Sequence, residues 1–356
     1  MSKKFQRVTR SMSKAAANTD IIQDERNETF LCFKDGLTLN SLINFCEHEK
    51  NKQIKNTKKQ RFVNDTISNL LQVLDQLHEL NEIVGLDDIK NTVSEHVLYM
   101  AQNLTSETDM NHIQICGPPG IGKTTLAILL GRIYANLGYL EYGNVITVTR
   151  ADLIGEHLGS TSIKTEEMLQ ACRGNVMFID EVYSFGCADK RDSFSKECLD
   201  CINMYLSTYR EDMLCIIAGY EEDIKDCVFS VNKGLERRFP WKYVLQQYTS
   251  EQLRDIFILQ IKQNDWNVDE NDEKTKSMIL SIFNDTNKHY FEYSGGDTEI
   301  LFMRCKIAHS SRLFANDTCE RKTLNSHDLR RGFDMFVQFK KKTINKTKEH
   351  ISMMYC

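Results

Sequence analysis

The stretch Cys116-Gly117-Pro118-Pro119-Gly120-Ile121-Gly122-Lys123-Thr124-Thr125 decides the fold. It matches the pattern G-x-x-x-x-G-K-[ST], in which a glycine-rich backbone wraps phosphate oxygens. Residues 111–116 before it alternate polar and apolar side chains as a strand does, and apolar residues after it recur at helical spacing. Strand, glycine loop and helix in this order predict a phosphate site at a helix start, where the helix dipole assists. A glycine turn with a chance lysine is the alternative, and the flanking elements disfavour it.

The residues of this loop take separate roles in the prediction. We expect Lys123 to reach the β- and γ-phosphates of ATP, and the Thr124 hydroxyl to hold Mg²⁺. Further contacts with the nucleotide are expected from Gly117, Pro118, Pro119, Gly120, Ile121, Gly122 and Thr125. The predicted cofactors are therefore ATP and Mg²⁺.

A second motif, Val176-Met177-Phe178-Ile179-Asp180-Glu181, is an apolar strand that ends in two carboxylates. We expect Asp180 to lie beside Thr124 and to bind Mg²⁺ directly or through water. Glu181 is expected to orient and polarise the attacking water. The pattern is common alone, but it is specific where it follows a phosphate loop.

Strand patterns also predict the architecture. They fall at residues 111–116, 145–149, 176–179, 214–218 and 242–245, with helical patterns between most of them. This alternation predicts an α/β fold, with a five-stranded parallel sheet and helices on both faces. Phosphate sites in such sheets lie at the carboxyl ends of the strands. After the capping box Thr249-Ser250-Glu251-Gln252, helical patterns dominate to about residue 338.

The composition limits the environment and the partners. Of 356 residues, 41% are hydrophobic and 27% charged, which suits a soluble protein with a core. The net charge of -5 gives no general attraction to nucleic acid or to an anionic membrane. No apolar run reaches bilayer length and no signal segment begins the chain, so we expect a cytoplasmic protein without a membrane partner. The 12 cysteines form no framework and are expected to be reduced; the lone pair Cys198-x-x-Cys201 does not predict a metal site.

The N-terminal region precedes the sheet. Residues 1–28 are polar and predict a flexible arm, and residues 30–46 predict one or two short helices. The run at 50–61 holds six basic residues and no acid, which is typical of a solvated linker, with nucleic-acid contact as the alternative. Residues 63–80 have the spacing of an amphipathic helix.

Several further motifs resemble one family. The segment Val84-Gly85-Leu86-Asp87-Asp88-Ile89-Lys90 resembles the opening motif of AAA+ ATPases, in which the backbone at Val84 and Gly85 borders the adenine. The segments 150–165, 178–184, 217–220 and 232–239 are similar, in the same order, to the branch of the red-type Rubisco activases and stage V sporulation protein K. The resemblance covers roughly residues 82 to 312.

The resemblance implies further roles. Arg238 stands in the slot of an arginine finger that reaches the γ-phosphate of a neighbouring subunit, with Arg237 as the fallback and a surface ion-paired arginine as the alternative. Tyr220 stands in the sensor-1 slot, which is asparagine in many relatives. His157 falls in a central-pore loop that would contact a client; the alternative is an ordinary exposed loop residue.

The C-terminal part resembles the helical lid of this family. Gly295-Gly296-Asp297 stands where the sensor-2 motif would place an arginine, so either Arg304 substitutes or the function is missing. Residues 295–314 also resemble lids of AAA+ proteins from large DNA viruses, which would place the protein in the host cytoplasm. The last residues form a basic tail that we expect to be disordered.

These observations predict four regions. They are an extension at 1–81, flexible and then helical, a nucleotide-binding α/β domain at 82–248, a helical lid at 249–338 and a basic tail at 339–356. The predicted function is ATP hydrolysis with Mg²⁺ in a homo-oligomeric ring, most simply a hexamer, that remodels or threads a protein client. The alternatives are a nucleic-acid motor or loader, and a nucleotide-gated assembly scaffold with slow turnover.

Overall fold

The computed structural model describes residues 36–55, 65–106, 109–157, 159–185, 193–210, 213–269, 272–315 and 321–354. The predicted arm at 1–28 and residues 56–61 of the basic run lie outside this part. The chain divides into two compact units: Met1–Ile83, Asp87–Asp109 and Leu129–Gly143 form the first, and Val84–Leu86, Met110–Ile128 and Asn144–Cys356 form the second.

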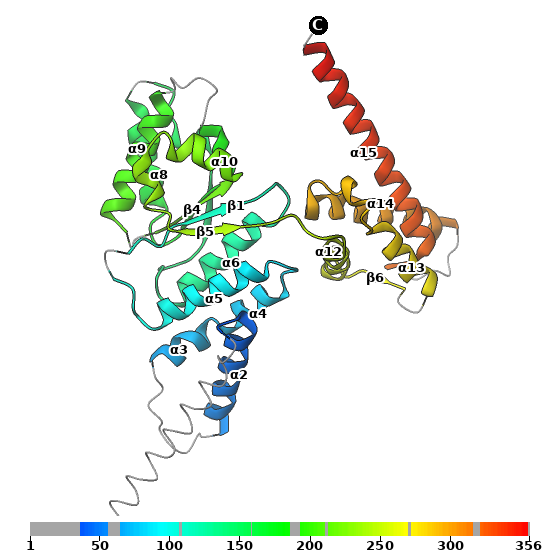
Figure 1. Ribbon diagram of the computed structural model, residues 1–356, viewed down its shortest axis with the longest axis horizontal. Helices are drawn as coiled ribbons and strands as arrows, with labels where there is room; N and C mark the ends of the chain where they lie inside the picture. Colours follow the sequence, from blue (N-terminus) through cyan, green and yellow to red (C-terminus); the bar gives the residue numbers. More distant parts are fainter. Residues whose placement is uncertain are drawn as a thin grey trace, which may run out of the picture. The chain divides into compact units, whose positions relative to one another are not determined.

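The described part of the first unit is helical. It holds α2 (Leu39–Lys55), α3 (Asp65–Gln72), α4 (Leu74–Glu82), α5 (Asp87–Ala101) and the later part of α6 (Lys123–Asn136), labelled in Figure 1. The predicted single helix over 63–80 is wrong in one respect, because the chain leaves helical geometry at Val73, with ψ near 3°. The Val73 side chain is fully buried, so the apolar spacing continues through the break and gives no signal of it.

A buried lysine closes the end of α4. The ammonium of Lys90, on α5, donates hydrogen bonds to the carbonyl oxygens of Ile83 (2.6 Å) and Asn81 (3.1 Å). Burial lowers the pKa of Lys90 from its ordinary value. A cation at this position offsets the negative end of the helix dipole and satisfies carbonyl groups that the helix itself leaves unpaired.

The second unit contains the predicted sheet. Its strands are β1 (Ile113–Cys116), β2 (Val145–Val148), β3 (Val176–Ile179), β4 (Leu214–Gly219) and β5 (Trp241–Val244), all parallel, in the order β2-β3-β4-β1-β5. The prediction of a five-stranded parallel sheet is confirmed. Every residue of β3 and β4 is buried, which explains their continuous apolar sequences.

Short and long helices flank the sheet. They are α7 (Arg150–Leu153), α8 (Ser160–Ala171), η1 (Val182–Phe185), α9 (Ser193–Thr208), α10 (Glu221–Ile224), η2 (Lys225–Phe229) and α11 (Lys233–Glu236). Helices α8 and α9 pack against each other (Figure 1). One hydrophobic cluster joins them to the sheet, with Leu169 from α8, Ile202 from α9 and Ile217 from β4 among its members.

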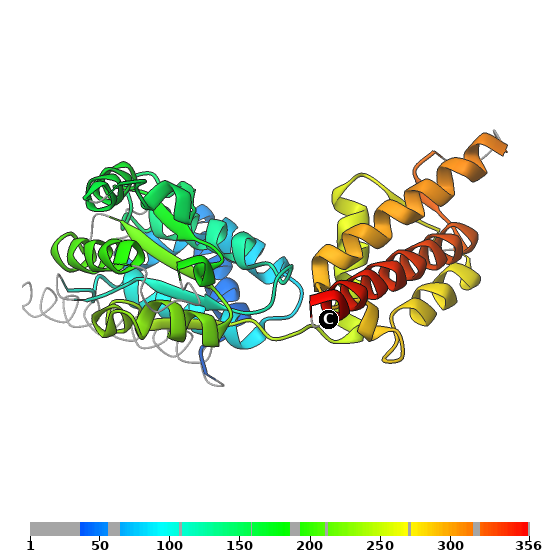
Figure 2. The same ribbon diagram turned by 90° about the horizontal axis from the view of Figure 1, so that it is seen from above.

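The C-terminal region is helical with one small exception. It comprises α12 (Ser250–Gln263), α13 (Glu273–Ile282), η3 (Lys288–Tyr290), α14 (Ser294–Ala315) and α15 (Ser326–Met354), and α14 and α15 lie side by side (Figure 2). The expected all-helical lid also holds a parallel pair, β6 (Asn267–Val268) with β7 (Thr323–Leu324). Strands of two residues are too short to produce an alternating pattern in the sequence.

The expectation of a disordered basic tail is wrong, because α15 continues through it to Met354. No glycine or proline follows Gly332, and lysine is a good helix former. Phe336 and Lys340 of this helix are buried. No described helix is both long and apolar enough to cross a membrane.

Helices α14 and α15 approach closely at one glycine. A Cβ atom on Gly332 would lie 2.5 Å from Sγ and 2.8 Å from Cα and the backbone nitrogen of Cys305. Backbone atoms cannot move aside as a flexible side chain does, so this contact requires glycine.

We therefore expect Gly332→Ala to lower the free energy of unfolding by about 1–3 kcal/mol, because the added methyl group forces the two helices apart. Thermal melting followed by circular dichroism measures this loss. Gly296→Ala is the matched control, since a Cβ there meets nothing within 4 Å. Native melting of the Gly332→Ala protein would contradict the close crossing.

Candidate nucleotide site

The phosphate loop joins the end of β1 at Cys116 to the start of α6 at Lys123. Gly120 and Gly122 have φ angles of 74° and 99°, in the left-handed region that favours glycine. A Cβ atom on Gly120 would also lie 2.2 Å from the carbonyl oxygen of Tyr293. The glycines are therefore required by backbone conformation and by close approach.

Hydrogen bonds from three elements fix the loop. Gly117 N–H donates to Gly219 O at the end of β4 (3.0 Å). The hydroxyl of Tyr248, beyond β5, donates to Ile121 O (2.9 Å), and Gly295 N–H, in α14, donates to Gly120 O (3.0 Å). The bonds from Tyr248 and Gly295 occupy carbonyl oxygens of the loop and leave the N–H groups of Gly120 and Ile121 to face an anion.

Lys123 stands half-buried at the first position of α6. Its ammonium donates to Gly117 O (3.2 Å) and Pro118 O (3.1 Å) of the loop. Burial lowers the pKa of Lys123, and the carboxylates of Asp180 and Glu181 act against that shift. The three charged residues predicted from the sequence are therefore close enough to interact.

The two carboxylates follow β3 directly. Asp180 is half-buried, and its Oδ1 accepts the N–H of Glu181 (2.9 Å). Glu181 is exposed and has a φ of 53°, which is unfavourable for a residue other than glycine. Such strain is found at functional positions, where the surrounding structure holds an otherwise poor conformation.

Thr124 and Asp180 fit a magnesium ion that shares its ligands with a nucleotide. The Thr124 side chain is exposed in the first turn of α6. Within the described segments, no three histidine, cysteine, aspartate or glutamate side chains gather as a complete metal site. Mg²⁺ is usually held by one or two protein groups together with phosphate oxygens and water, so a site of two residues suits it.

Tyr220 lies at the same edge of the sheet. It follows β4, which pairs with both β1 and β3, so Tyr220 comes between the phosphate loop and Asp180 in the order of strands. Its side chain is 47% exposed and open to a ligand. The predicted sensor role agrees with this place in the sheet and stays a prediction.

Of the two residues expected beside the adenine, Gly85 lies close to the first turn of α12. Gly85 has a φ of 69°, and a Cβ atom there would lie 2.6 Å from Nε2 of Gln252. The capping box that begins α12 is present as predicted: Thr249 Oγ1 accepts the N–H of Gln252 (3.2 Å), and Gln252 Oε1 accepts the N–H of Thr249 (2.9 Å). The contact with adenine itself stays a prediction.

The two finger candidates differ in their surroundings. Arg238 is half-buried, and its guanidinium donates to Ser207 Oγ from Nε (3.0 Å) and Nη2 (2.7 Å) and to Gly234 O from Nη1 (3.2 Å). Burial lowers the pKa of His112 to about 3, and the positive charge of Arg238 adds to that shift. Arg237 is exposed, and its side chain makes no hydrogen bond or ion pair with any residue that the structure describes; only its backbone N–H donates, to Leu235 O.

His157 lies in the exposed connection between α7 and α8. Its backbone N–H donates to Ser160 Oγ (3.1 Å), and its carbonyl oxygen accepts the hydroxyl of Ser160 (2.7 Å). These bonds shape the loop and leave the imidazole exposed. The next residue, Leu158, lies outside the described residues.

Arg304, the possible substitute for the missing sensor-2 arginine, contacts an aromatic ring of α15. It lies nine residues beyond Gly295 on α14, which is about 13 Å along a helix. Its guanidinium lies over the ring of Phe339, 5.2 Å from the centroid. Asp297, at the position where the resemblance predicts a sensor-2 arginine, is fully buried.

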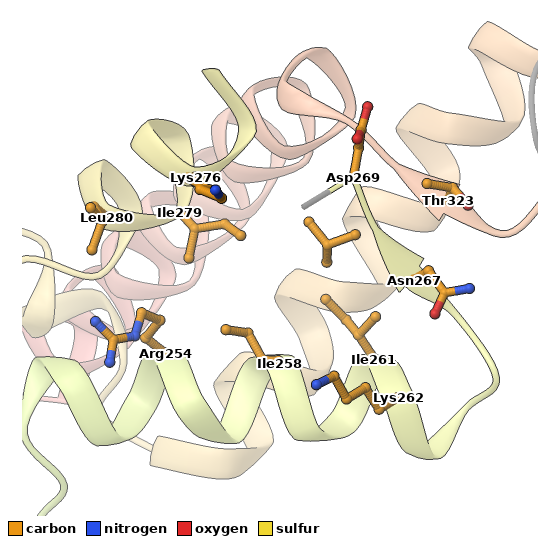
Figure 3. Close-up of a pocket in the computed structure, with 11 residues that line it drawn as sticks. Arg254, Ile258, Ile261, Lys262, Asn267, Asp269, Lys276, Ile279, Leu280 and Thr323 are labelled. Atoms are coloured by element: carbon orange, nitrogen blue, oxygen red, sulfur yellow. The ribbon is translucent and has the colours of Figure 1, made fainter. Parts of the chain in front are cut away.

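A hollow of about 870 Å³ lies in the lid, between α12, α13 and the β6–β7 pair (Figure 3). Ile258 and Ile261 of α12 face Ile279 and Leu280 of α13 across it. Its lining includes none of the residues predicted to act on the nucleotide, so it is separate from the phosphate site.

Two contacts of the phosphate loop had no signal in the sequence. Tyr248 lies beyond β5, and Gly295 lies far along the chain, yet both donate to loop carbonyl groups. The pairing of β5 with β1 explains why residues after β5 reach the loop. Only the three-dimensional arrangement shows the contact from α14.

The fold and the site define the class of protein. A glycine loop between β1 and α6, with two carboxylates after β3 in a sheet of the order β2-β3-β4-β1-β5, is a phosphate-loop nucleotide site.

The comparisons with known proteins identify the family. The pattern of the ATPase family associated with various cellular activities (AAA) matches residues 113–240. A cfxQ-like protein of Acanthamoeba polyphaga mimivirus is 35% identical over 311 residues, 87% of this chain and 74% of that protein. A CfxQ homolog of Pyropia yezoensis is 30% identical over 280 residues, 75% and 91% of the two chains, and stage V sporulation protein K of Bacillus subtilis is 28% identical over 262 residues, 70% and 80%. The chain belongs to the AAA ATPase family, as the sequence motifs predicted.

We expect Lys123→Ala to weaken ATP binding by about a hundredfold, because the phosphates lose their charged donor. Isothermal titration calorimetry measures the dissociation constant. Lys276→Ala is the control, because Lys276 is an exposed lid lysine paired with Glu273 (3.0 Å). Native affinity in the Lys123→Ala protein would remove the assignment of the phosphate loop.

Proposed function

We propose that the protein hydrolyses ATP with Mg²⁺ in a homo-oligomeric ring, a hexamer, and uses this reaction to remodel or thread a protein client. One observation carries the enzymatic part. The Lys123 ammonium is held on the phosphate loop where the charges of Asp180 and Glu181 act on it. This arrangement joins a phosphate-binding cation, a metal ligand and a candidate base.

Each residue has a defined task in this proposal. The loop N–H groups and Lys123 bind and orient the phosphates, and Thr124 and Asp180 hold the metal. Bound Mg²⁺ supplies neutralisation of the phosphate charge. Glu181 orients a water molecule and takes up its proton, for which its exposed carboxylate is suited. Tyr220 is placed to add a hydrogen bond to that water or to a phosphate.

The ring follows from the need for a cation from outside the subunit. Arg238 is the proposed finger because of its position in the motif. Its guanidinium would have to break its hydrogen bonds to Ser207 Oγ to reach the nucleotide of a neighbouring subunit. Arg237 is the alternative, because its side chain is already exposed. A permanent charge with a planar donor fork suits either residue for this task.

The client is proposed to contact the exposed loop at His157. An exposed imidazole can contact a protein client through its apolar ring face and through its two polar nitrogens. Cross-linking from position 157, in a ring held with ATP by Glu181→Gln, would identify the client. Labelling no different from that at an exposed site such as Glu167 would remove this role.

A cytoplasmic location is part of the same proposal. It is supported by cysteines that lie as free thiols in the described segments, at positions 46, 116, 172, 198, 201, 215, 227 and 305. Thiols persist in the reducing interior of cells.

A scaffold with slow turnover is the second candidate function. Asp297 favours it, because a buried carboxylate stands at the position where the resemblance predicts the arginine of the sensor-2 motif. Measured turnover separates the two, since ring formation on ATP with almost no phosphate release defines the scaffold.

The Glu181→Gln substitution tests the reaction. We expect native ATP binding with turnover reduced by about 10²- to 10⁴-fold, because the base is lost while Asp180 still holds the metal. Phosphate release and calorimetry give the two quantities. Glu167→Gln, an exposed change on α8, is the control. Near-native turnover in the Glu181→Gln protein would place the base elsewhere.

Mixed rings test the finger. Arg238→Ala should keep ATP binding and lose hydrolysis, and mixing it with Lys123→Ala subunits should restore part of the activity, because some interfaces then combine an intact finger with an intact loop. Phosphate release from a series of mixing ratios measures this. Arg237→Ala in the same series is the comparison. Restoration with Arg237→Ala alone would assign the finger to Arg237, and inactive mixtures of both would exclude a finger in this pair.

A further inference from the structure

The start of α14 lies directly against the phosphate loop. Gly295 N–H donates to Gly120 O (3.0 Å), and a Cβ atom on Gly120 would lie 2.2 Å from Tyr293 O. A Cβ atom on Gly295 would lie 3.0 Å from Gly120 O. Backbone therefore packs on backbone without intervening side chains, so the position of the loop at Gly120 depends on the turn at residues 293–296.

Asp297 holds this turn from within the lid. Its Oδ2 accepts the N–H of Tyr293 (2.8 Å), and its side chain is fully buried. Ser294, inside the turn, has a φ of 45°, which a residue other than glycine adopts only when its surroundings enforce it. Gln260 of α12 adds a donor to Gly295 O (3.0 Å). The turn is thus fixed by side chains that themselves do not reach the loop.

Lys340 of α15 provides the counter-charge. Its ammonium lies 2.6 Å from Oδ1 of Asp297, as an ion pair outside hydrogen-bond alignment, and the residue is 8% exposed. The ammonium also lies 4.9 Å from the ring centre of Tyr293 and 5.9 Å from that of Phe336. A carboxylate buried without a cation is strongly unfavourable, so the Lys340 ammonium offsets the cost of burying Asp297.

We propose that Asp297 and Lys340 are positioning residues for the nucleotide: their buried ion pair holds the turn at 293–296 against Gly120 and keeps the phosphate loop in its binding shape. The inference rests on the proposed ATP function and extends it from the loop to α15. The pair acts through Gly120 and not by touching the nucleotide. Asp297 of this ion pair lies at the position where the resemblance predicts the sensor-2 arginine.

A direct contact of Lys340 with the γ-phosphate is the competing explanation. It is disfavoured because Asp297 neutralises the ammonium at 2.6 Å and both groups are buried. The two explanations differ in the ligands they affect. A brace on Gly120 supports the part of the loop that cradles the α- and β-phosphates, so ADP and ATP should be affected alike. A contact with the γ-phosphate would affect ATP alone.

The test compares dissociation constants of ADP and ATP, each with Mg²⁺, by calorimetry on the full chain. Lys340→Met keeps most of the side-chain volume and removes the charge. We expect both constants to rise by about tenfold, because a loop that is no longer held in place must be ordered by its ligand. The turnover number at saturating ATP should stay within about twofold, since Lys123, Asp180 and Glu181 are untouched.

Lys306→Met is the matched control. Lys306 also lies over an aromatic ring of the lid, with its ammonium 4.5 Å from the centre of Phe302, but it belongs to the middle of α14. We expect native constants for it. Asp297→Asn is the milder second variant, because an amide oxygen still accepts the Tyr293 N–H while the charge is lost, and both constants should rise at least threefold.

The outcomes separate the explanations. Raised constants for both nucleotides, with native values for Lys306→Met, support the brace. Native constants in Lys340→Met, or in Asp297→Asn if Lys340→Met does not fold, overturn it, and so does a loss confined to ATP. A fall in melting temperature with unchanged constants also overturns it, since the pair then only stabilises the lid. Failure of the unmodified protein to bind ATP would instead reject the proposed function.

Discussion

The site depends on bringing a lysine ammonium and two carboxylates to one edge of a parallel sheet. Lys123 lies half-buried on its loop, and the charges of Asp180 and Glu181 oppose the effect of burial on its pKa. Lys123 and Asp180 are half-buried, and because burial disfavours an isolated charge, the opposite charges nearby offset that cost. The proposed nucleotide and its metal would add charges of both signs to the same place, so the free site already holds charges that could bind them.

Much of the architecture could be predicted because its causes are local. The strands β3 and β4 are continuous apolar runs, and the loop between β1 and α6 has a spacing that few other structures require. The capping box at Thr249 likewise predicted the start of α12. Each of these features depends on residues that are neighbours in the chain, which is the information that a single sequence displays.

The features that escaped prediction depend on contacts between distant segments. The basic run near the C-terminus was predicted to be a disordered tail, yet Lys340 within it is buried against Asp297. The donors that Tyr248 and Gly295 direct at the loop are more than a hundred residues away from it in sequence. The charge pattern of a segment predicts whether it is exposed to solvent. It does not show whether a distant segment places an oppositely charged residue beside it.

The left-handed backbone of Glu181 has a consequence for how such a protein would respond to selection. A glycine at this position would adopt the same conformation without cost, so the residue best suited to the backbone is one without a carboxylate. Screening variants for thermal stability alone would favour the loss of the very group proposed to activate water. On the proposed role of Glu181, stability and turnover are in opposition at this residue, and a more stable variant that keeps the carboxylate gains its stability elsewhere in the chain.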